Sequence, residues 1–482
     1  MMSPEIAACA GHALAVPLTL LLASLTALFI PILTRRDDPL PGVIVLGAAL
    51  VLLGLFPASN TASFSMFDGA LAVGPFTGYL WPFFLAALAL TVLISLSARN
   101  GKPGAGEYYF LLSMAALGLM FLVSAGELLT AFISVELLSV CLYALSAINR
   151  SPAGAEAGYK YFLLGSFGTG MLVMGIALIY GTTGTLHYEA IKLSATPAIP
   201  LLQPSSFLVH PSLTAAGFVF LIAGFSFKTA LVPFHMWVPD VYEGAPTPVS
   251  AFMGAAVKAG AAVVLYRLFT LTAGAAQFRE IFWALAVLTM VLGNLMALPQ
   301  HNVKRLLAYS SISHAGYIIT GFFGGTEGLK AVLFYLVVYS CANIGAFAVV
   351  AALEKEDRGV TIKELAGLSE RRPYLAGAMS LFILSLAGIP PLAGFFGKFY
   401  LFTAALKGGC LWLVIIALLM SAVSVYYYLR ILVAMYMEKG HAAQAAPSSR
   451  AMTFALALLS LAVTALGIFS TPLLKLAQTA AF

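Results

Sequence analysis

Four charged side chains lie inside long apolar stretches of this chain and are the residues best suited to do chemistry. They are Glu136, Lys228, Lys258 and Lys398. A charge at the centre of a membrane-spanning helix costs about 2.5–3.5 kcal/mol on insertion scales, so such a residue is retained where it is paired or used. Burial disfavours a charged lysine, and a nearby carboxylate favours it. A glutamate and a lysine whose separation changes can therefore take up and release a proton.

The energies involved suit a proton pump. A change of two to three units in the pKa of a lysine corresponds to about 3–4 kcal/mol, and moving one charge against about 150 mV needs roughly 3.5 kcal/mol. The alternative for Lys228 is an amine that extends along its helix to the membrane surface. The apolar stretch continues from Lys228 to Phe234, which argues against this alternative. Lys258 shares a face with Ser250 and Gly254, small residues that let another helix approach closely.

Two histidines are candidate relay residues, because the pKa of histidine lies near neutrality. His314 lies in the sequence between Lys258 and Lys398 and could bridge them through water. A packed histidine that only makes hydrogen bonds is an equally good interpretation of His314. His235 follows Lys228 by seven residues, which would place it on nearly the same helical face at a cytoplasmic proton entry. Packing at the membrane interface is the alternative for His235. Further polar residues suited to such a path are Tyr317, Asn294 and Asn343.

The composition indicates what kind of scaffold holds these residues. The chain has 482 residues, of which 61% are hydrophobic and 9% are charged, against roughly 45–50% and 25% in soluble domains. Runs of about 20 apolar residues, enough to cross a bilayer as a helix, follow one another along the chain. We expect an all-α, polytopic membrane protein with about fourteen transmembrane helices and no strands. The expected helices span residues 13–34, 40–57, 77–98, 107–123, 126–148, 157–180, 213–235, 246–271, 278–298, 302–323, 328–352, 375–405, 410–437 and 450–472.

The sequence contains no ligand pattern for a common cofactor. The four cysteines are scattered singly, without a C-x-x-C pair or a histidine at ligand spacing, and apolar packing is the role expected of them. No glycine-rich dinucleotide fingerprint follows a strand. We therefore expect no iron–sulfur cluster, haem, zinc or nucleotide on this chain. Its start lacks a basic stretch followed by a small-residue cleavage site, so the first helix is expected to remain.

Basic residues are distributed unevenly between the expected loops. Loops that leave odd-numbered helices hold fifteen lysines and arginines, whereas loops on the other side hold four. Because cytoplasmic loops of membrane proteins are enriched in basic residues, the richer side is expected to face the cytoplasm. Both termini would then lie on the outer, periplasmic side of the cell's inner membrane.

A short phrase occurs twice in the chain. AGFSFK ends at Lys228 and AGFFGK ends at Lys398, in the seventh and twelfth expected helices, which cross in opposite directions. Pro233 follows the first lysine, and Pro390 and Pro391 precede the second, so both helices are expected to be broken near mid-membrane. This pattern indicates two inverted five-helix repeats, helices 4–8 and 9–13. The expected segments are 1–104 for helices 1–3, 105–272 and 273–438 for the two repeats, and 439–482 for helix 14.

Longer stretches resemble a known family. A close resemblance to the subunit N family of the bacterial proton-pumping NADH:quinone oxidoreductase, complex I, is carried by FKTALVPFHMWVPDVYEGAPTPVSAFMGAAVKAGA (227–261), KRLLAYSSISHAGY (304–317) and LSLAGIPPLAGFFGKFYLF (384–402). The same family is matched by ISVELLSVCLYAL (133–145) and YFLLGSFGTGM (161–171). Among its antiporter-like relatives, subunit N is favoured by VYEGAPTP, by a lysine in helix 12 and by the lack of a long C-terminal lateral helix.

The resemblance implies a fold with two inverted five-helix bundles, each supplying half of a proton path. By position, Glu136 resembles the glutamate that modulates the pumping lysine, Lys228 resembles that lysine, Lys258 the central relay, and Lys398 the lysine of the exit half. The chain would be a non-redox subunit of an NADH:quinone oxidoreductase translocase, with FMN, iron–sulfur clusters and quinone bound by partner subunits. The implied partners are other antiporter-like and small connecting membrane-arm subunits and the lipid bilayer, with no nucleic acid.

Three other functions remain open from the sequence. The chain resembles, in its helices and lysines, a subunit of a multi-subunit cation/proton antiporter, although VYEGAPTP argues against that assignment. A related complex with a different electron donor, linked to hydrogenase or ferredoxin, would use the same membrane chemistry. A scaffold that pumps nothing is the third function, and the membrane charges argue against it because a passive bundle would be more stable with leucine.

Overall fold

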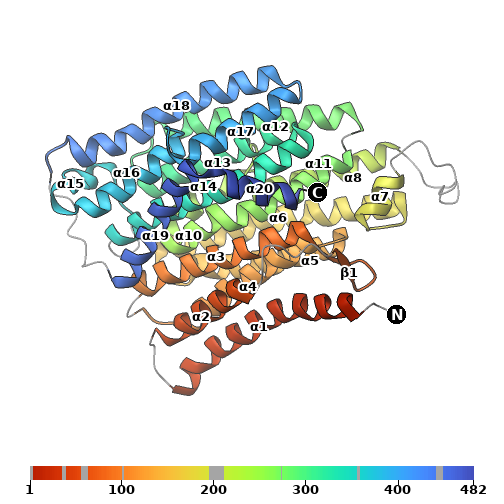
Figure 1. Ribbon diagram of the computed structural model, residues 1–482, viewed down its shortest axis with the longest axis horizontal. Helices are drawn as coiled ribbons and strands as arrows, with labels where there is room; N and C mark the ends of the chain where they lie inside the picture. Colours follow the sequence, from red (N-terminus) through yellow and green to blue (C-terminus); the bar gives the residue numbers. More distant parts are fainter. Residues whose placement is uncertain are drawn as a thin grey trace.

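A computed structural model describes residues 4–34, 39–55, 63–99, 102–194, 211–272, 274–354, 359–440 and 449–481. Long helices lie side by side with roughly parallel axes, from α1 and α2 at one edge to α18 at the other (Figure 1). A helix suits these apolar stretches because it bonds all of its backbone polar groups within one segment. Eleven helices in the described part of the chain are long and apolar enough to cross a membrane. The chain is a multi-pass membrane protein that is almost entirely helical, as predicted.

The helices follow the expected order along the chain, with short additional helices between them. Their bounds are α1 (Pro4–Thr34), α2 (Leu40–Leu55), α3 (Pro75–Ala98), α4 (Ala105–Ser124), α5 (Leu128–Ala147), α6 (Pro152–Thr183), α7 (Tyr188–Ser194), α8 (Pro211–Thr229), α9 (Trp237–Gly244), α10 (Thr247–Phe252), α11 (Lys258–Thr272), α12 (Ala276–Ala297), α13 (Val303–Phe322), α14 (Gly325–Leu353), α15 (Leu368–Arg371), α16 (Pro373–Ala387), α17 (Ala393–Lys407), α18 (Leu411–Tyr436), α19 (Arg450–Ile468) and α20 (Ser470–Ala480). The last predicted helix, 450–472, is shorter than expected, and α20 after it was not predicted.

The core of the bundle lies around α10, α11, α13 and α14, whose side chains are almost all buried. The outer helices α6 and α18 instead carry large apolar side chains on their exposed faces, among them Phe162, Phe167 and Trp412. Apolar surface of this extent is typical of faces that contact lipid or another protein.

The helix that carries Lys228 is shorter than predicted. It ends at Thr229, because Ala230 takes a left-handed backbone conformation with φ +66° that stops the helix. Residues 230–236 then form turns up to α9. A break near Pro233 was predicted from the sequence, but the continuation of the helix to Phe234 is wrong.

Two other predicted spans are interrupted. The span 375–405 is split into α16 and α17, since Gly388, with φ +89°, provides the left-handed residue that ends α16. The span 246–271 contains a π-helical turn, Met253–Val257, between α10 and α11. Lys258 is the first residue after this turn. The break at the prolines was predicted, whereas the π-helical turn was not.

The two copies of the repeated phrase lie on opposite sides of their helix breaks. Lys228 is the last residue but one of α8, so the first copy precedes its break. Lys398 is the sixth residue of α17, so the second copy follows its break. This placement agrees with the prolines, which follow the first lysine and precede the second in the sequence.

The expectation of no strands is wrong at one place. β1 (Phe64–Met66) pairs antiparallel with β2 (Leu71–Val73). The turn between them has positive φ at Phe67, Asp68 and Gly69, and aspartate and glycine are residue types that such values accommodate readily. An Asp-Gly pair between apolar residues is a hairpin signal that the sequence contained.

Candidate functional site

Lys228 is enclosed by aromatic rings at the end of α8. Its Nζ atom lies 5.1 Å from the ring centroids of Tyr143 on α5 and Tyr161 on α6, and 5.4 Å from that of Phe227. The ammonium group donates a hydrogen bond to the Tyr143 hydroxyl at 3.3 Å. Lys228 is only 4% exposed. Its amine is therefore held among the rings, where cation–π attraction stabilises it, and does not extend to the membrane surface.

Glu136 lies in the same neighbourhood as Lys228 but has a different partner. It is half-buried in the middle of α5, and its Oε1 atom accepts a hydrogen bond from the Thr169 hydroxyl on α6 at 2.7 Å. No ion pair within 4.0 Å joins Glu136 to Lys228, although the structure describes both side chains. Tyr143, the partner of Lys228, lies two turns from Glu136 on the same helix, about 10 Å along its axis. The glutamate and the lysine that the sequence paired, Glu136 and Lys228, are therefore not in contact in the structure.

Lys258 is buried between α11 and α13. Its ammonium group donates hydrogen bonds to the backbone carbonyl of Ser311 and, at 2.9 Å, to the Ser311 hydroxyl. The small residue Gly254, one turn earlier, lets Asn343 of α14 approach, since a Cβ atom at 254 would lie 2.6 Å from Asn343 Nδ2. The close helix approach that the sequence predicted on this face is confirmed.

His314 lies one turn after Ser311 on α13 and contacts two tyrosine hydroxyls. Its Nδ1 atom is hydrogen-bonded to the Tyr335 hydroxyl on α14, and its Nε2 atom lies 3.2 Å from the Tyr428 hydroxyl on α18. The same Tyr428 hydroxyl also bonds Ser310. In neutral histidine one ring nitrogen donates and the other accepts, so the two hydroxyls must take opposite roles. Such an arrangement can pass a proton through the ring.

Lys398 is buried at the break between α16 and α17. Its ammonium group donates to the backbone carbonyl of Ala387 at 3.0 Å and to the Ser421 hydroxyl at 2.8 Å, and lies 5.1 Å from the centroid of the Tyr317 ring. The Tyr317 hydroxyl accepts a hydrogen bond from the Asn294 side chain. A pocket of about 320 Å³ between α17 and α18 is lined by Lys398 and Ser421 among apolar side chains.

One face of α13 brings three of these groups together. Ser311, His314 and Tyr317 follow at intervals of three residues and therefore lie on one side of the helix. They contact Lys258 at one end and Lys398 at the other. The predicted residues Lys258, His314 and Lys398 thus form one buried series, whereas Lys228 and Glu136 lie among α5, α6 and α8.

His235 is not part of either group. It lies, half-buried, in the turns between α8 and α9. The prediction that it shares a helical face with Lys228 is wrong, because the helix ends at Thr229 and the spacing of seven residues no longer corresponds to two turns.

A cluster of half-exposed charges, which the sequence did not predict, joins α6, α9 and α13. Asp240 of α9 accepts hydrogen bonds from Lys160 and Arg305, both at 2.7 Å, and Arg305 also donates to Glu243 at 2.9 Å. Burial acts to raise the pKa of Asp240, but the two basic partners outweigh it and hold the pKa below its usual value. The only sequence signal for this cluster was that its charged residues lie near the edges of expected loops. The pairing could not be predicted, because Lys160 and Arg305 lie 80 and 65 residues from Asp240 in the sequence.

A buried ion pair near this cluster was also missed. Lys304 and Glu354 lie 3.2 Å apart, with side chains 0% and 6% exposed. Lys304 also donates to the backbone carbonyl of Ala245, and Glu354 accepts from the Thr247 hydroxyl and the Gly359 amide. Ala245 and Thr247 belong to the VYEGAPTP stretch, so this stretch positions the ion pair.

The central part of the chain matches a known family model. Residues 125–424, which include all six predicted site residues, match the family described as NADH:quinone oxidoreductase/Mrp antiporter, TM. The chain is also 42% identical over 426 residues to NADH-quinone oxidoreductase subunit N of Trichlorobacter lovleyi, covering 82% of this chain and 86% of that protein. The chain belongs to the NADH-quinone oxidoreductase subunit N family. The family predicted from the sequence is confirmed.

Solved structures similar to this subunit N family member share its fold over nearly their full length. A chain of respiratory complex I from Thermus thermophilus with bound aureothin is 33% identical, with a TM-score of 0.81, covering 95% of this chain and 98% of that one. A chain of the membrane-bound sulfane sulfur reductase, an archaeal respiratory membrane complex, is 27% identical with a TM-score of 0.85, covering 98% and 97%. Both of these structures are of respiratory complexes.

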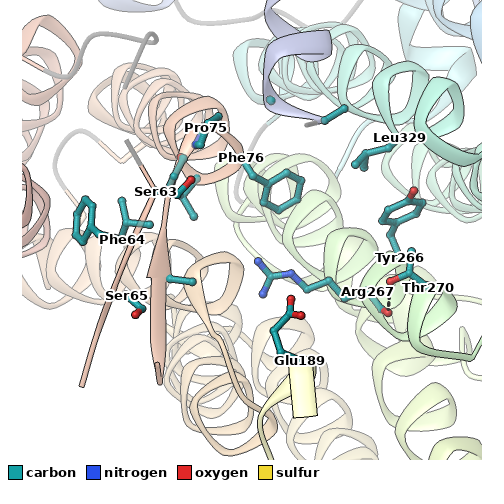
Figure 2. Close-up of a pocket in the computed structure, with 16 residues that line it drawn as sticks. Ser63, Phe64, Ser65, Pro75, Phe76, Glu189, Tyr266, Arg267, Thr270 and Leu329 are labelled. Atoms are coloured by element: carbon teal, nitrogen blue, oxygen red, sulfur yellow. Dashed lines mark hydrogen bonds between the residues drawn. The ribbon is translucent and has the colours of Figure 1, made fainter. Parts of the chain in front are cut away.

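At the opposite end of α13 from Arg305, this subunit N family member has a pocket of about 750 Å³. Figure 2 shows the Arg267 guanidinium and the Glu189 carboxylate in it, from α11 and α7. Arg267 donates to the backbone carbonyls of Ala125 and Val123, so it caps the end of α4. None of the six predicted site residues, all of which the structure describes, lines this pocket.

Proposed function

We propose that this chain is a membrane-arm subunit of a proton-pumping NADH:quinone oxidoreductase and translocates protons while quinone is reduced in other subunits. The observation that carries the proposal is the buried series of polar and titratable groups along α13, from Lys258 through Ser311 and His314 to Lys398. Buried charges of this kind are costly in a membrane, and they mark ion and proton paths. Membership of the subunit N family supports the same function.

In this proposal, protons move by changes of partner among fixed groups. Lys228 exchanges the Tyr143 hydroxyl for the Glu136 carboxylate, and its affinity for a proton rises as the carboxylate approaches. Protons then pass between Lys258 and Lys398 by way of His314 and water. A hydroxyl partner at each ring nitrogen of His314 lets it accept a proton on one side and release one on the other.

Electron transfer takes no part in the action of this chain itself. FMN, the iron–sulfur clusters and the quinone belong, in this proposal, to partner subunits of the same complex. The partners in the membrane are other antiporter-like subunits and small connecting subunits. Coupling reaches this chain through movements at those contacts.

The proposed arrangement in the membrane has fourteen crossings. Eleven of these crossings are the long apolar helices, and the other three are α2, α13 and the broken pair α16–α17. Helices 4–8 and 9–13 of this series form two inverted repeats, in segments 105–272 and 273–438, flanked by 1–104 and 439–482. Both termini lie on the periplasmic side of the inner membrane, because the loops rich in basic residues stay in the cytoplasm.

The experiment that tests the function uses the tagged complex, extracted gently from its own membranes. We expect flavin, iron–sulfur signals and NADH:quinone reductase activity to purify with the chain. In membrane vesicles, Lys228→Ala and Glu136→Gln are expected to lower the proton uptake per NADH oxidised while the complex still assembles. Lys407→Ala, an exposed lysine at the end of α17, is the matched control. Normal uptake in both site variants would contradict the proposal.

A cation/proton antiporter is the second candidate, because the matched family model covers both kinds of protein. The purification separates the candidates. A stable complex without flavin or iron–sulfur signals favours the antiporter. Redox centres without NADH activity favour a complex with a different electron donor.

A further inference from the structure

The two members of the Glu136–Lys228 pair are each bound to a separate hydroxyl group. Thr169 donates to the Glu136 carboxylate, and the Lys228 ammonium donates to the Tyr143 hydroxyl. A carboxylate and an ammonium group in a membrane would otherwise attract each other strongly, since the surroundings screen charges weakly. Their separation therefore needs partners that compete with the ion pair.

The partners of Lys228 are held rigidly. Trp237 stacks on Tyr161 with ring centroids 4.3 Å apart and an interplanar angle of 5°, and its indole N–H donates to the backbone carbonyl of Phe227 at 2.9 Å. Tyr161 in turn meets Tyr143 edge to face at 4.8 Å. Rings fixed in this way keep a cation site in place at little entropic cost.

One stretch of α6, residues 161–169, contributes three features of this arrangement. Tyr161 gives one ring, and Thr169 gives the hydroxyl bound to Glu136. Gly165 leaves space for Tyr143, because a Cβ atom at 165 would lie 2.0 Å from the tyrosine hydroxyl oxygen. These positions belong to the glycine-rich YFLLGSFGTGM stretch, and their spacing of four residues places them on one face of α6.

We infer that Thr169 and Tyr143 are positioning residues that hold the Glu136–Lys228 pair in its separated state. The inference rests on the proposed function, in which the pair must open and close during each cycle. A hydrogen bond to a charged group changes an equilibrium by about tenfold or more. Loss of either hydroxyl therefore shifts the pair toward permanent contact, and a pair that cannot open no longer passes protons.

The test compares hydroxyl variants in the intact complex. Thr169→Val keeps the shape of the side chain and removes its hydroxyl, Thr169→Ser restores the hydroxyl, and Tyr143→Phe removes the other hydroxyl while keeping the ring. Ser166→Ala is the matched control on α6, because the Ser166 hydroxyl bonds only a carbonyl of its own helix. Proton uptake per NADH oxidised is measured in membrane vesicles, together with the amount of assembled complex.

We expect uptake per NADH to fall about fivefold or more in Thr169→Val and Tyr143→Phe, and to return to at least half of the normal value in Thr169→Ser. Ser166→Ala should pump normally. Normal pumping in either hydroxyl-less variant, or failure of Thr169→Ser to restore it, overturns the inference. If a variant at position 169 does not assemble, proton uptake per NADH in Tyr143→Phe alone tests the inference. If Lys228→Ala and Glu136→Gln stop pumping while the hydroxyl variants do not, only this inference fails; if all of them pump, the proposed function fails as well.

Discussion

Lys258 on α11 is bound to Ser311 on α13 through both the backbone carbonyl and the side-chain hydroxyl of the serine. The contact fixes the lysine at the centre of the bundle, three residues along α13 from His314. The carbonyl that it uses lies inside a helix, so this acceptor is available without any break in α13. The relation between Lys258 and Ser311 is the link from the first half of the chain to the series that ends at Lys398.

Removing the Ser311 hydroxyl is expected to weaken pumping without stopping it. In Ser311→Ala the backbone carbonyl still accepts from Lys258, but one hydrogen bond to the ammonium group is lost. We expect proton uptake per NADH oxidised to fall about threefold, measured by dye quenching in vesicles. Thr320→Val, on the same helix, removes a hydroxyl that bonds the carbonyl of Gly316 and should pump normally. Equal uptake in both variants would show that the Ser311 hydroxyl has no part in the path.

Two glycines of α6 should respond very differently to alanine. At Gly165 a Cβ atom would lie 2.0 Å from the Tyr143 hydroxyl oxygen, whereas at Gly170 nothing lies within 4 Å. Gly165→Ala is therefore expected to displace Tyr143, with a cost of about 1–3 kcal/mol from overpacking. Gly170→Ala is expected to leave stability unchanged or raise it slightly. Thermal unfolding of the purified complex and uptake per NADH check both, and a harmless Gly165→Ala would contradict the packing described here.

Breaking the Lys304–Glu354 pair should destabilise the protein more than removing the whole pair. In Lys304→Met the buried Glu354 carboxylate keeps Thr247 and Gly359 as donors but loses its counter-charge, at a cost of about 3–5 kcal/mol. The double variant Lys304→Met with Glu354→Gln carries no buried charge and should recover at least half of the loss. The measurement is the melting temperature of the solubilised complex. If the double variant is less stable than Lys304→Met, the unpaired Glu354 carboxylate is not what destabilises Lys304→Met.

The Asp240 cluster gives a stability that depends on pH. Since the pKa of Asp240 in the folded chain lies below its usual value near 3.8, the cluster stabilises the fold fully above that value. This stabilisation is lost as the pH falls through the lower folded pKa. The melting temperature of Asp240→Asn should therefore lie below that of the unmodified chain by a constant amount between about pH 6 and 8, and the difference should shrink only below about pH 4. A difference that shrinks already at pH 6 would contradict this assignment.

The sequence predicted well what depends on composition along one stretch of chain. Long apolar runs become helices because a membrane leaves few other ways to bond the backbone. Glu136, Lys258 and Lys398 stand out as candidates because each is charged within such a run. The closeness of α11 to its neighbours was also predictable, from the small residue Gly254 one turn before Lys258.

What the sequence could not predict depends on contacts between distant segments or on single backbone torsions. The end of α8 at Thr229 depends on the left-handed backbone conformation of Ala230. Alanine rarely adopts this conformation, so the sequence does not indicate that the helix ends there. The bond between Thr169 and Glu136 joins residues 33 positions apart, and only the packing of α5 against α6 brings them together.

In the proposed path, protons pass through the buried series that begins at Lys258. The most direct measurement compares the complex containing Lys258→Ala with the complex containing Lys407→Ala, each reconstituted in liposomes and supplied with NADH and quinone. We expect internal acidification per NADH oxidised to fall at least about tenfold for Lys258→Ala and to stay normal for Lys407→Ala. Normal acidification with Lys258→Ala would contradict it.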